Sequence, residues 1–367
     1  GCAAYEGFWQ GPQASLQAGQ TLGAGVWQRF CFVEWPVLRP WLAGGSCLVF
    51  LYCFSGFGLA LLLGGSRYAT VEVEIYQLVM YELDMAQASV LVWMVLGVTA
   101  LAGLLYAYLS RQTASDKAVR ALLPHRPQSF GERVLLVFSL MILLLCCLLP
   151  LAAVVFLAVS AGGSWGVLLE QETLAAGWNT LRFSGMAVLT AVVLGVMYAA
   201  VARRVAWVRG LVFLPFMVSP VCIAAGILLL YPQWTASLPL LVATYALLAY
   251  PFVAKDVLAA WDDLPVDYVS AARGMGANAF QTTLYVTAPL LKPALRRGLT
   301  LAAATCIGEF AATLFLSRPE WQTLTTLIYS YLGRAGEDNY ARAMVLTTVL
   351  MLLSLMVFLL LDEREKT

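Results

Sequence analysis

The sequence has few charged residues and almost no histidine. Charged residues make up 12% of its 367 positions, against 61% hydrophobic residues. A soluble domain could not bury that much apolar surface, so the composition excludes a soluble protein and indicates a membrane protein. His125 is the single histidine, and neither a nucleophile–histidine–acid set nor a glycine-rich phosphate loop is present. We therefore do not expect an enzyme: the chain itself should neither hydrolyse nor oxidise a substrate.

The eight cysteines follow no pattern typical of a disulfide framework or a metal site. No CxxC motif or Cys/His cluster occurs, and six lie within apolar runs: Cys47, Cys53, Cys146, Cys147, Cys222 and Cys306. We interpret them as small apolar packing residues. We expect no metal site, and no nucleic acid among the partners.

Apolar stretches long enough to cross about 30 Å of hydrocarbon alternate with short charged clusters. They predict eight spanning helices, at Leu42–Leu63, Ala86–Leu109, Val134–Val159, Phe183–Ala202, Gly210–Tyr231, Leu238–Phe252, Gly298–Leu316 and Ala343–Leu361. Five of the 22 basic residues fall on one side of this arrangement: Arg67, Arg182, Arg318, Arg334 and Arg342. Because basic residues concentrate in cytoplasmic segments, these five mark the outside.

One polar passage on the cytoplasmic side stands apart from its surroundings. "SAARGMGANAFQTTLYVTAPLLKP", Ser270 to Pro293, carries two basic residues, two glycines and two prolines between long apolar runs. Its small residues suit a helix–turn–helix that another protein can grip, and Gly276 can supply the backbone freedom of the turn. We call this passage the second elbow.

A matching elbow occurs near the start of the chain. A shift of 253 positions places Gly23 on Gly276 and Pro36 on Pro289. The same shift also pairs Cys53 with Cys306, Phe57 with Phe310, and Ile75-Tyr76 with Ile328-Tyr329. One offset that holds for about sixty residues indicates an internal repeat. We interpret the chain as a tandem duplication, and a duplicated cytoplasmic elbow predicts a duplicated cytoplasmic partner.

The duplication predicts how the chain is organised. Residues 1–109 correspond to the C-terminal part of a first half, 110–133 to a cytoplasmic linker, and 134–367 to a second half of six spans with its elbow at about 255–297. Four spans precede the second elbow, whereas the first elbow begins almost at Gly1. We therefore expect that four N-terminal spans are missing from this chain; the alternative is a natural protein of eight spans.

Both elbows resemble a motif of bacterial ABC importer permeases. That family carries a cytoplasmic loop with Glu-Ala-Ala, then three residues, Gly, nine residues and Ile-x-Leu-Pro. The second elbow matches it at Ser270, Ala271, Ala272, Gly276, Val286 and Pro289, and the first at Gln17, Ala18, Gly19, Gly23, Val33 and Pro36. The family's glutamate is replaced by Ser270 or Gln17, and its leucine by Ala288 or Trp35, which puts the glutamate's ionic contact in doubt.

The resemblance implies a fold, partners and a location. The fold would be an all-α polytopic membrane protein of the type I, MetI-like permease class, in the inner membrane. Two copies of a cytoplasmic ATPase would grip the elbows, and a periplasmic binding protein would deliver the substrate outside. ATP would bind to the partner ATPase, so this chain would hold no cofactor.

Other stretches resemble the fused permeases of iron(III) and thiamine importers. "FVEWPVLRP", "LLLGG" and "TVEVEIYQ" look most like the thiamine type, whereas "CIGEFAATLFLSRPEWQTLTTLIY" fits iron(III) relatives equally well. A permease for another small solute of the polyamine, sulfate or phosphonate class is an alternative. A secondary transporter is a further rival, but it would not need a duplicated elbow. A membrane enzyme would need clustered ionisable groups, which the sequence does not show.

Glu309 is the sharpest candidate for the substrate path. It lies about eleven residues into the seventh predicted span, near the middle of the bilayer, where a carboxylate is costly unless it faces a cavity or a partner. It would attract a cationic substrate, or it would be a protonated packing residue; both interpretations stay open. The first copy has Gly56 at this position. Pro215, Pro220 and Pro251 are candidate bends in path-lining helices or kinks absorbed by packing.

Overall fold

The computed structural model describes residues 19, 21–64, 67–113, 130–213, 218–234, 237–316 and 318–361, and these residues form helices and connecting turns without strands. The chain divides into two compact units, Gly1–Gly56 with Val90–Cys146, and Phe57–Ser89 with Cys147–Thr367. Helices of the first unit are α3 (Val26–Arg29), η1 (Phe30–Glu34), α4 (Trp35–Phe54), most of α7 (Met85–Thr113), α8 (Phe130–Leu143) and the start of η3 (Leu144–Leu148).

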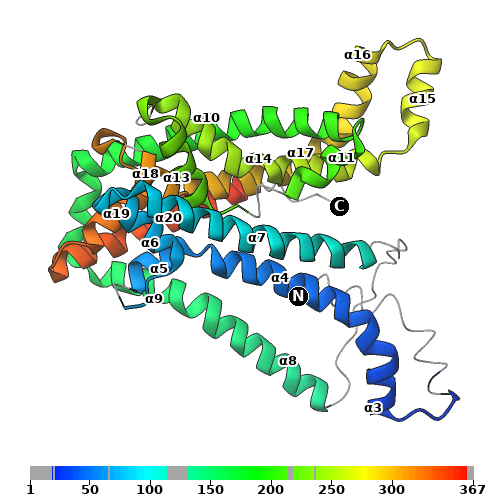
Figure 1. The fold of residues 1–367 in the computed structure, drawn as a ribbon, viewed down its shortest axis with the longest axis horizontal. Helices are drawn as coiled ribbons and strands as arrows, with labels where there is room; N and C mark the ends of the chain where they lie inside the picture. The colour runs from blue at the N-terminus through cyan, green and yellow to red at the C-terminus, as the bar shows by residue number, and fades with distance from the viewer. Residues whose placement is uncertain are drawn as a thin grey trace. The chain divides into compact units, whose positions relative to one another are not determined.

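The second unit contains the remaining helices of the described chain (Figure 1). They are α5 (Phe57–Leu63), α6 (Val71–Gln77), η2 (Leu78–Glu82), α9 (Leu149–Ser160), η4 (Gly162–Leu169), α10 (Gln171–Ala202), α11 (Ala206–Gly210), η5 (Leu211–Phe213), α13 (Pro220–Leu230), η6 (Pro232–Trp234), α14 (Leu238–Asp262), α15 (Val266–Gly274), α16 (Ala279–Thr282), η7 (Thr283–Thr287), α17 (Ala288–Ile307), α18 (Ala311–Leu316), η8 (Pro319–Trp321), α19 (Leu324–Leu332) and α20 (Glu337–Leu361).

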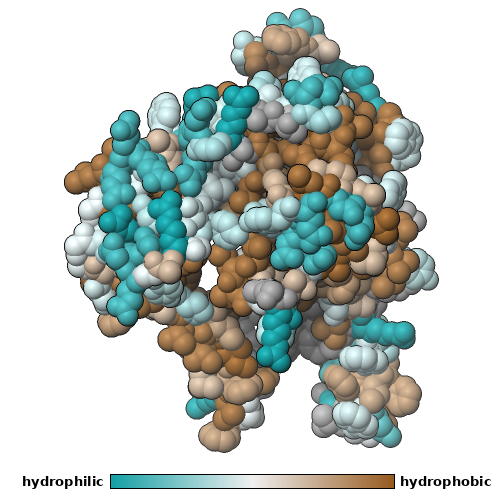
Figure 2. Space-filling model, turned by 60° about the vertical axis from the view of Figure 1, so that its left-hand side comes forward, coloured by the Kyte–Doolittle hydropathy of each residue, from teal (hydrophilic) through white to brown (hydrophobic). Residues whose placement is uncertain are grey.

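Five helices of the described chain are long and apolar enough to cross a membrane. They are Met85–Tyr106, Arg133–Ser160, Gln171–Ala202, Leu238–Asp262 and Glu337–Leu361. Each covers one of the eight predicted spans. Large areas of the molecular surface are hydrophobic, as lipid contact requires (Figure 2). The all-helical membrane fold expected from composition is therefore confirmed.

The other three predicted spans are not single continuous helices, although the first is a bent pair, Gly45–Phe54 and Phe57–Leu63, that can form one broken span. In the first, α4 ends at Phe54 and α5 begins at Phe57; in the seventh, α17 ends at Ile307 and α18 begins at Ala311. In the fifth, only the eleven-residue α13 is apolar helix among the described positions. The helices are interrupted at Gly56 and Gly308, and a new helix begins at Pro220. Averaged hydropathy does not detect such helix breaks.

The core of the second unit consists of α10, α14 and α17 packed against one another. A second cluster of buried side chains joins α9, η4, α19 and α20, and includes Leu327, Tyr331 and Leu346. In Figure 1, α15 and α16 lie at one end of this unit, and α6, α18 and α19 lie toward the other end. If the elbow is cytoplasmic, as predicted, α6 and α19 would lie on the outer side.

Candidate functional site

The turn of the second elbow is built around a left-handed glycine. α15 ends at Gly274, and Gly276 has φ +87°, a conformation that other residues adopt at a cost. The Gly276 N–H donates to the Arg273 carbonyl (3.0 Å) and the Ala277 N–H to the Ala272 carbonyl (3.1 Å). This pair of bonds is the Schellman arrangement, which satisfies the last carbonyls of a helix.

The helix that follows this turn is capped by its own residues. The Asn278 side chain accepts from the Gln281 N–H (2.8 Å), and the Gln281 side chain accepts from the Asn278 N–H (3.0 Å). This reciprocal pair is a capping box, which fixes the direction in which α16 leaves the turn. The shape of the elbow is therefore specified by hydrogen bonds within the elbow itself.

The first elbow has the same local geometry at the positions related by the shift of 253. Gly23 has φ +77°, and the Ala24 N–H donates to the Gly19 carbonyl over 3.0 Å. A π-helix follows each turn, Phe30–Glu34 in the first elbow and Thr283–Thr287 in the second. Gln17 and Ala18 lie outside the described residues.

Each elbow exposes three large apolar side chains at equivalent positions. In the first they are Leu22, Trp27 and Phe32, with 86%, 75% and 80% of their surface exposed; in the second they are Met275, Phe280 and Tyr285, with 83%, 73% and 73%. Exposed apolar patches of this kind are typical of surfaces that contact another protein or a membrane. Of the small residues predicted to form the contact surface, Ala271 is exposed, whereas Ala272 is buried.

The remaining predicted elbow residues have local roles. The Ser270 hydroxyl, at the position of the family's glutamate, donates to the Asp267 carbonyl of its own helix over 3.1 Å. Pro36 and Pro289 are exposed and lie at the start of α4 and α17, directly after the π-helices η1 and η7. The backbone stays helical across both junctions, so each proline removes one backbone hydrogen bond where the π-helix gives way to α-helix.

The second elbow is joined to the helical core through one tight contact. α14 leads into the elbow and α17 leads out of it. A Cβ added to Gly298 of α17 would lie 2.7 Å from the Val253 Cα of α14, and one added to Gly195 of α10 would lie 2.8 Å from the Val253 Cβ. Small residues thus let three helices meet at Val253.

Glu309 lies in the break between α17 and α18. Its side chain is 9% exposed, and one carboxylate oxygen accepts from the Ala312 N–H over 3.0 Å. The Glu309 carbonyl accepts from the Thr325 hydroxyl (3.0 Å) and from the Tyr245 hydroxyl (3.4 Å). The carboxylate caps the start of α18, and the carbonyl ties the break to α19 and α14, so we interpret Glu309 first as the residue that stabilises the broken helix.

Glu72 of α6 supplies a second buried carboxylate that the sequence analysis missed. It is 1% exposed, and both of its oxygens lack a hydrogen-bond partner among the described residues, although the Ser219 hydroxyl and the Phe57 N–H face it. Burial raises the pKa of Glu72 to about 7. Glu72 faces the start of α5 as Glu309 faces the start of α18. The first copy has Gly56 at the position equivalent to Glu309, but Glu72, sixteen residues further along the chain, places a carboxylate beside the equivalent break.

Aromatic residues related by the shift of 253 meet beside these breaks. The Phe57 and Tyr76 rings lie 5.7 Å apart, and the equivalent Phe310 and Tyr329 rings lie 5.4 Å apart. Phe57 also stacks on Phe310, with ring centres 5.9 Å apart. The two predicted copies therefore face each other across a cluster of four rings.

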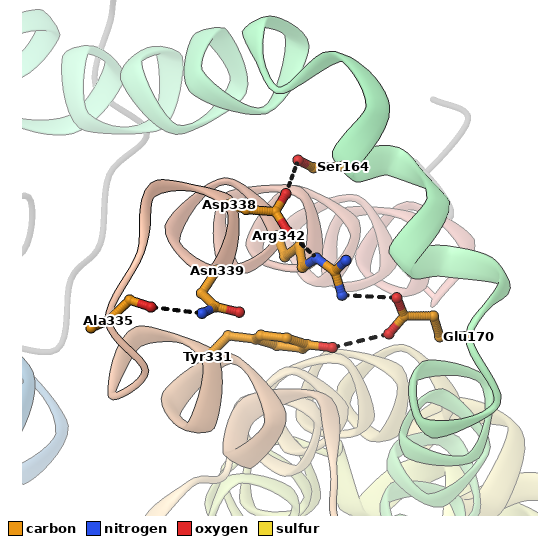
Figure 3. Close-up of polar contacts among 7 residues, drawn as sticks. All are labelled: Ser164, Glu170, Tyr331, Ala335, Asp338, Asn339 and Arg342. Atoms are coloured by element: carbon orange, nitrogen blue, oxygen red, sulfur yellow. Dashed lines mark hydrogen bonds and ion pairs between the residues drawn. The ribbon is translucent and has the colours of Figure 1, made fainter.

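A polar network joins the ends of α10, α19 and α20 (Figure 3). The Arg342 guanidinium of α20 lies 2.8 Å from the Glu170 carboxylate at the start of α10 and 3.0 Å from Asp338. The Tyr331 hydroxyl of α19 donates to Glu170 over 3.1 Å, and the Ser164 hydroxyl donates to Asp338 over 3.0 Å. This network sets the position of α19, which carries Tyr329.

The three candidate prolines have different surroundings. Pro220 lies in the first turn of α13, directly after Ser219, whose hydroxyl accepts from the Val221 N–H over 3.2 Å. Pro251 is buried inside α14, two residues before Val253. Pro215 lies outside the described residues. Pro220 therefore begins a helix rather than bending one.

The sequence matches one protein family over most of its length. The family is described as the inner membrane component of binding-protein-dependent transport systems, and the match covers residues 5–115 and 187–362. The chain belongs to this family. It is therefore a permease subunit of a bacterial ABC importer and a multi-pass inner membrane protein, as the elbow motif predicted.

Curated relatives of this permease include thiamine transporters. The chain is 27% identical to the thiamine transport system permease protein ThiP of Escherichia coli K12, over 96% of this chain and 68% of the relative. It is 28% identical to ThiP of Brucella abortus, over 98% and 67%. A putative 2-aminoethylphosphonate permease, PhnV of Salmonella typhimurium, is 27% identical over 59% of this chain and 89% of the relative.

Solved structures support the permease fold. A chain of a bacterial alginate ABC transporter, in complex with a periplasmic protein bound to an alginate pentasaccharide, aligns with a TM-score of 0.53. The two chains are 17% identical, and the alignment covers 64% of this permease and 93% of the other chain.

Proposed function

We propose that this permease imports thiamine, which a periplasmic binding protein delivers, and that two ATPase subunits drive the import by gripping the two elbows. The chain's similarity to thiamine permeases over 96% of its length supports the substrate. The observation that carries the docking role is the matched pair of elbows. Each has a left-handed glycine turn and three exposed apolar side chains at the same spacing.

The equal geometry of the elbows supports a tandem duplication. Helices α4 and α17 begin and end at positions that differ by the same shift of 253 residues, and so do the two π-helices. Two equivalent elbows suit two identical ATPase subunits related by a two-fold axis. The duplication thus lets one chain present both docking sites.

The transport cycle follows from the contacts between elbow and spans. ATP binding would draw the ATPase subunits together, and their stronger binding to the elbows in that state would shift the permease between inward-open and outward-open forms. The contact of Gly195, Val253 and Gly298 would carry this displacement into the helical core. The helix segments α5 and α18, whose starts face Glu72 and Glu309, would reorient at the path.

Iron(III) is the rival substrate, because part of the second half resembles iron(III) permeases as much as thiamine ones. Uptake of labelled thiamine and of labelled ferric citrate by cells that express the complete transporter separates the two. We expect thiamine uptake that depends on ATP and on the binding protein. Uptake of ferric citrate alone would contradict the substrate, and uptake of thiamine without the ATPase would favour a secondary transporter.

Docking is tested at the apolar residues of the second elbow. Phe280→Asp places a charge on the exposed apolar surface, so the ATPase should no longer copurify with the permease and uptake should fall at least ten-fold. Trp207→Asp is the matched control, since Trp207 on α11 is 72% exposed but lies outside the elbow. Equal loss of the ATPase from both variants, or from neither, would refute the docking site.

A further inference from the structure

We propose that a pocket at the outer side of the second unit is an entry subsite for a ring-bearing organic cation. This proposal deepens the proposed function, on which it rests. The pocket has a volume of about 360 Å³ and is lined by Leu61, Tyr76, Gln77, Tyr81, Glu82 and Tyr329. This volume falls in the range of sites for small organic molecules. Its described lining has three aromatic rings, one carboxylate and no basic side chain.

The three tyrosines form a connected aromatic wall. The Tyr76 hydroxyl makes hydrogen-bond contacts with the hydroxyls of Tyr81 and Tyr329. The Tyr76 and Tyr81 rings lie 5.8 Å apart and nearly perpendicular, at 84°. Tyr76 is buried, whereas Tyr81 is 70% exposed, so the Tyr81 ring is open to an incoming molecule. A ring face of this kind attracts a cation through its quadrupole.

The charge of the pocket comes from the first copy alone. Glu82 is exposed at its rim. In the sequence alignment given by the shift of 253, Arg334 is equivalent to Tyr81 and Ala335 to Glu82. The second copy therefore lacks both the aromatic ring and the carboxylate. The Arg334 guanidinium lies instead over the Tyr331 ring at 5.0 Å and bonds the Ser330 hydroxyl. A contact that served only to join the two copies would not require Tyr81 and Glu82 in one copy and Arg334 and Ala335 in the other. A cation site, in contrast, requires an aromatic ring and a carboxylate together.

The backbone holds Tyr81 and Glu82 in place through a strained turn. They end the π-helix η2, and Leu83 that follows is left-handed, with φ 55° and ψ 23°. This conformation is costly for leucine and persists only where the surroundings fix it. Asp84 fixes it on the far side, because its N–H donates to the Leu78 carbonyl (3.0 Å) and its carboxylate accepts from the Gln87 N–H (3.0 Å).

The position of the pocket fits the first step of import. α6 and α19 lie toward the end of the second unit opposite to the second elbow (Figure 1), so the pocket lies on the side from which a binding protein would deliver its ligand. Thiamine combines a cationic ring with a second aromatic ring. One of these rings can stack on Tyr81 while the positive charge lies near Glu82.

Binding of labelled thiamine to the purified permease in nanodiscs tests the subsite. Tyr81→Ala and Glu82→Gln should each weaken binding about ten-fold, as expected for the loss of one cation–π contact or one charge partner. Tyr81→Phe should keep the affinity because it keeps the ring. Glu74→Gln, which changes an exposed carboxylate on α6 outside the pocket, should also leave binding unchanged.

A second probe separates the subsite from the substrate assignment. Benzyltrimethylammonium should compete with thiamine, and the uncharged thiamine derivative thiochrome should not. Binding of benzyltrimethylammonium that depends on Tyr81, without binding of thiamine, would support the subsite and overturn thiamine as cargo. Normal thiamine uptake and binding by both pocket variants would overturn the subsite and leave the proposed function standing. The subsite is also overturned if neither cation binds to the unaltered protein, or if only ferric citrate does. If the Tyr81→Ala variant does not fold, thiamine binding by the Glu82→Gln variant, which changes an exposed side chain, tests the subsite.

Discussion

Substitution of Gly298 by alanine should loosen the contact between the elbow helices and the core. A Cβ at this position would lie 2.7 Å from the Val253 Cα, 3.1 Å from the Phe252 carbonyl oxygen and 3.3 Å from the Val253 N. All three are backbone atoms of α14, so no side-chain rotation can relieve the overlap. Overpacking of this kind costs about 1–3 kcal/mol, against up to about 1 kcal/mol gained from alanine's better helix propensity.

The matched control is Gly185→Ala on α10, where an added Cβ meets nothing within 4 Å. Thermal unfolding of the two purified variants in the same detergent gives the comparison. We expect a lower melting temperature for Gly298→Ala and an unchanged or higher one for Gly185→Ala. Gly298→Ala should also reduce thiamine uptake per unit of ATP hydrolysed, because the elbow would be less firmly joined to the spans. Equal melting temperatures would refute the close helix contact.

Two further predictions concern the buried carboxylates. Because burial raises the pKa of Glu72 from 4.5 to about 7, the folded protein holds this proton more tightly than the unfolded chain. The contribution of Glu72 to stability should therefore be greatest below about pH 4.5 and fall by at most about 3 kcal/mol as the pH rises to 7. Glu72→Gln should abolish that part of the fall in melting temperature, and an identical pH profile would contradict it. At Glu309, Gln can still accept from the Ala312 N–H, so Glu309→Gln should keep stability, whereas Glu309→Ala should lose about 1 kcal/mol, the cost of a lost cap. A stable Gln variant that assembles with the ATPase but fails in uptake would show instead that its charge acts on the substrate.

The elbows could be predicted in detail because their signals are local. A glycine in the left-handed region, a capping box within four residues and prolines in the first turn of the next helix are all properties of neighbouring residues. The structure has the predicted left-handed turn at Gly276, and it adds a capping box at Asn278 and Gln281 that was not predicted although its signal is equally local. The three exposed apolar side chains could also have been found, since Met275, Phe280 and Tyr285 recur as Leu22, Trp27 and Phe32 under the shift that defines the repeat.

The sequence by itself determined the membrane class, the family and the two elbows, because composition, spacing and turn chemistry act over a few residues or over the whole chain. Only the tertiary structure decided which apolar runs break, where Glu72 lies and that Tyr76 meets Tyr329. Glu72 faces the start of α5 because α6 folds back onto it, and the Tyr76 and Tyr329 side chains meet although their helices lie 253 residues apart in the sequence. Such contacts depend on the packing of distant segments, which no local pattern encodes.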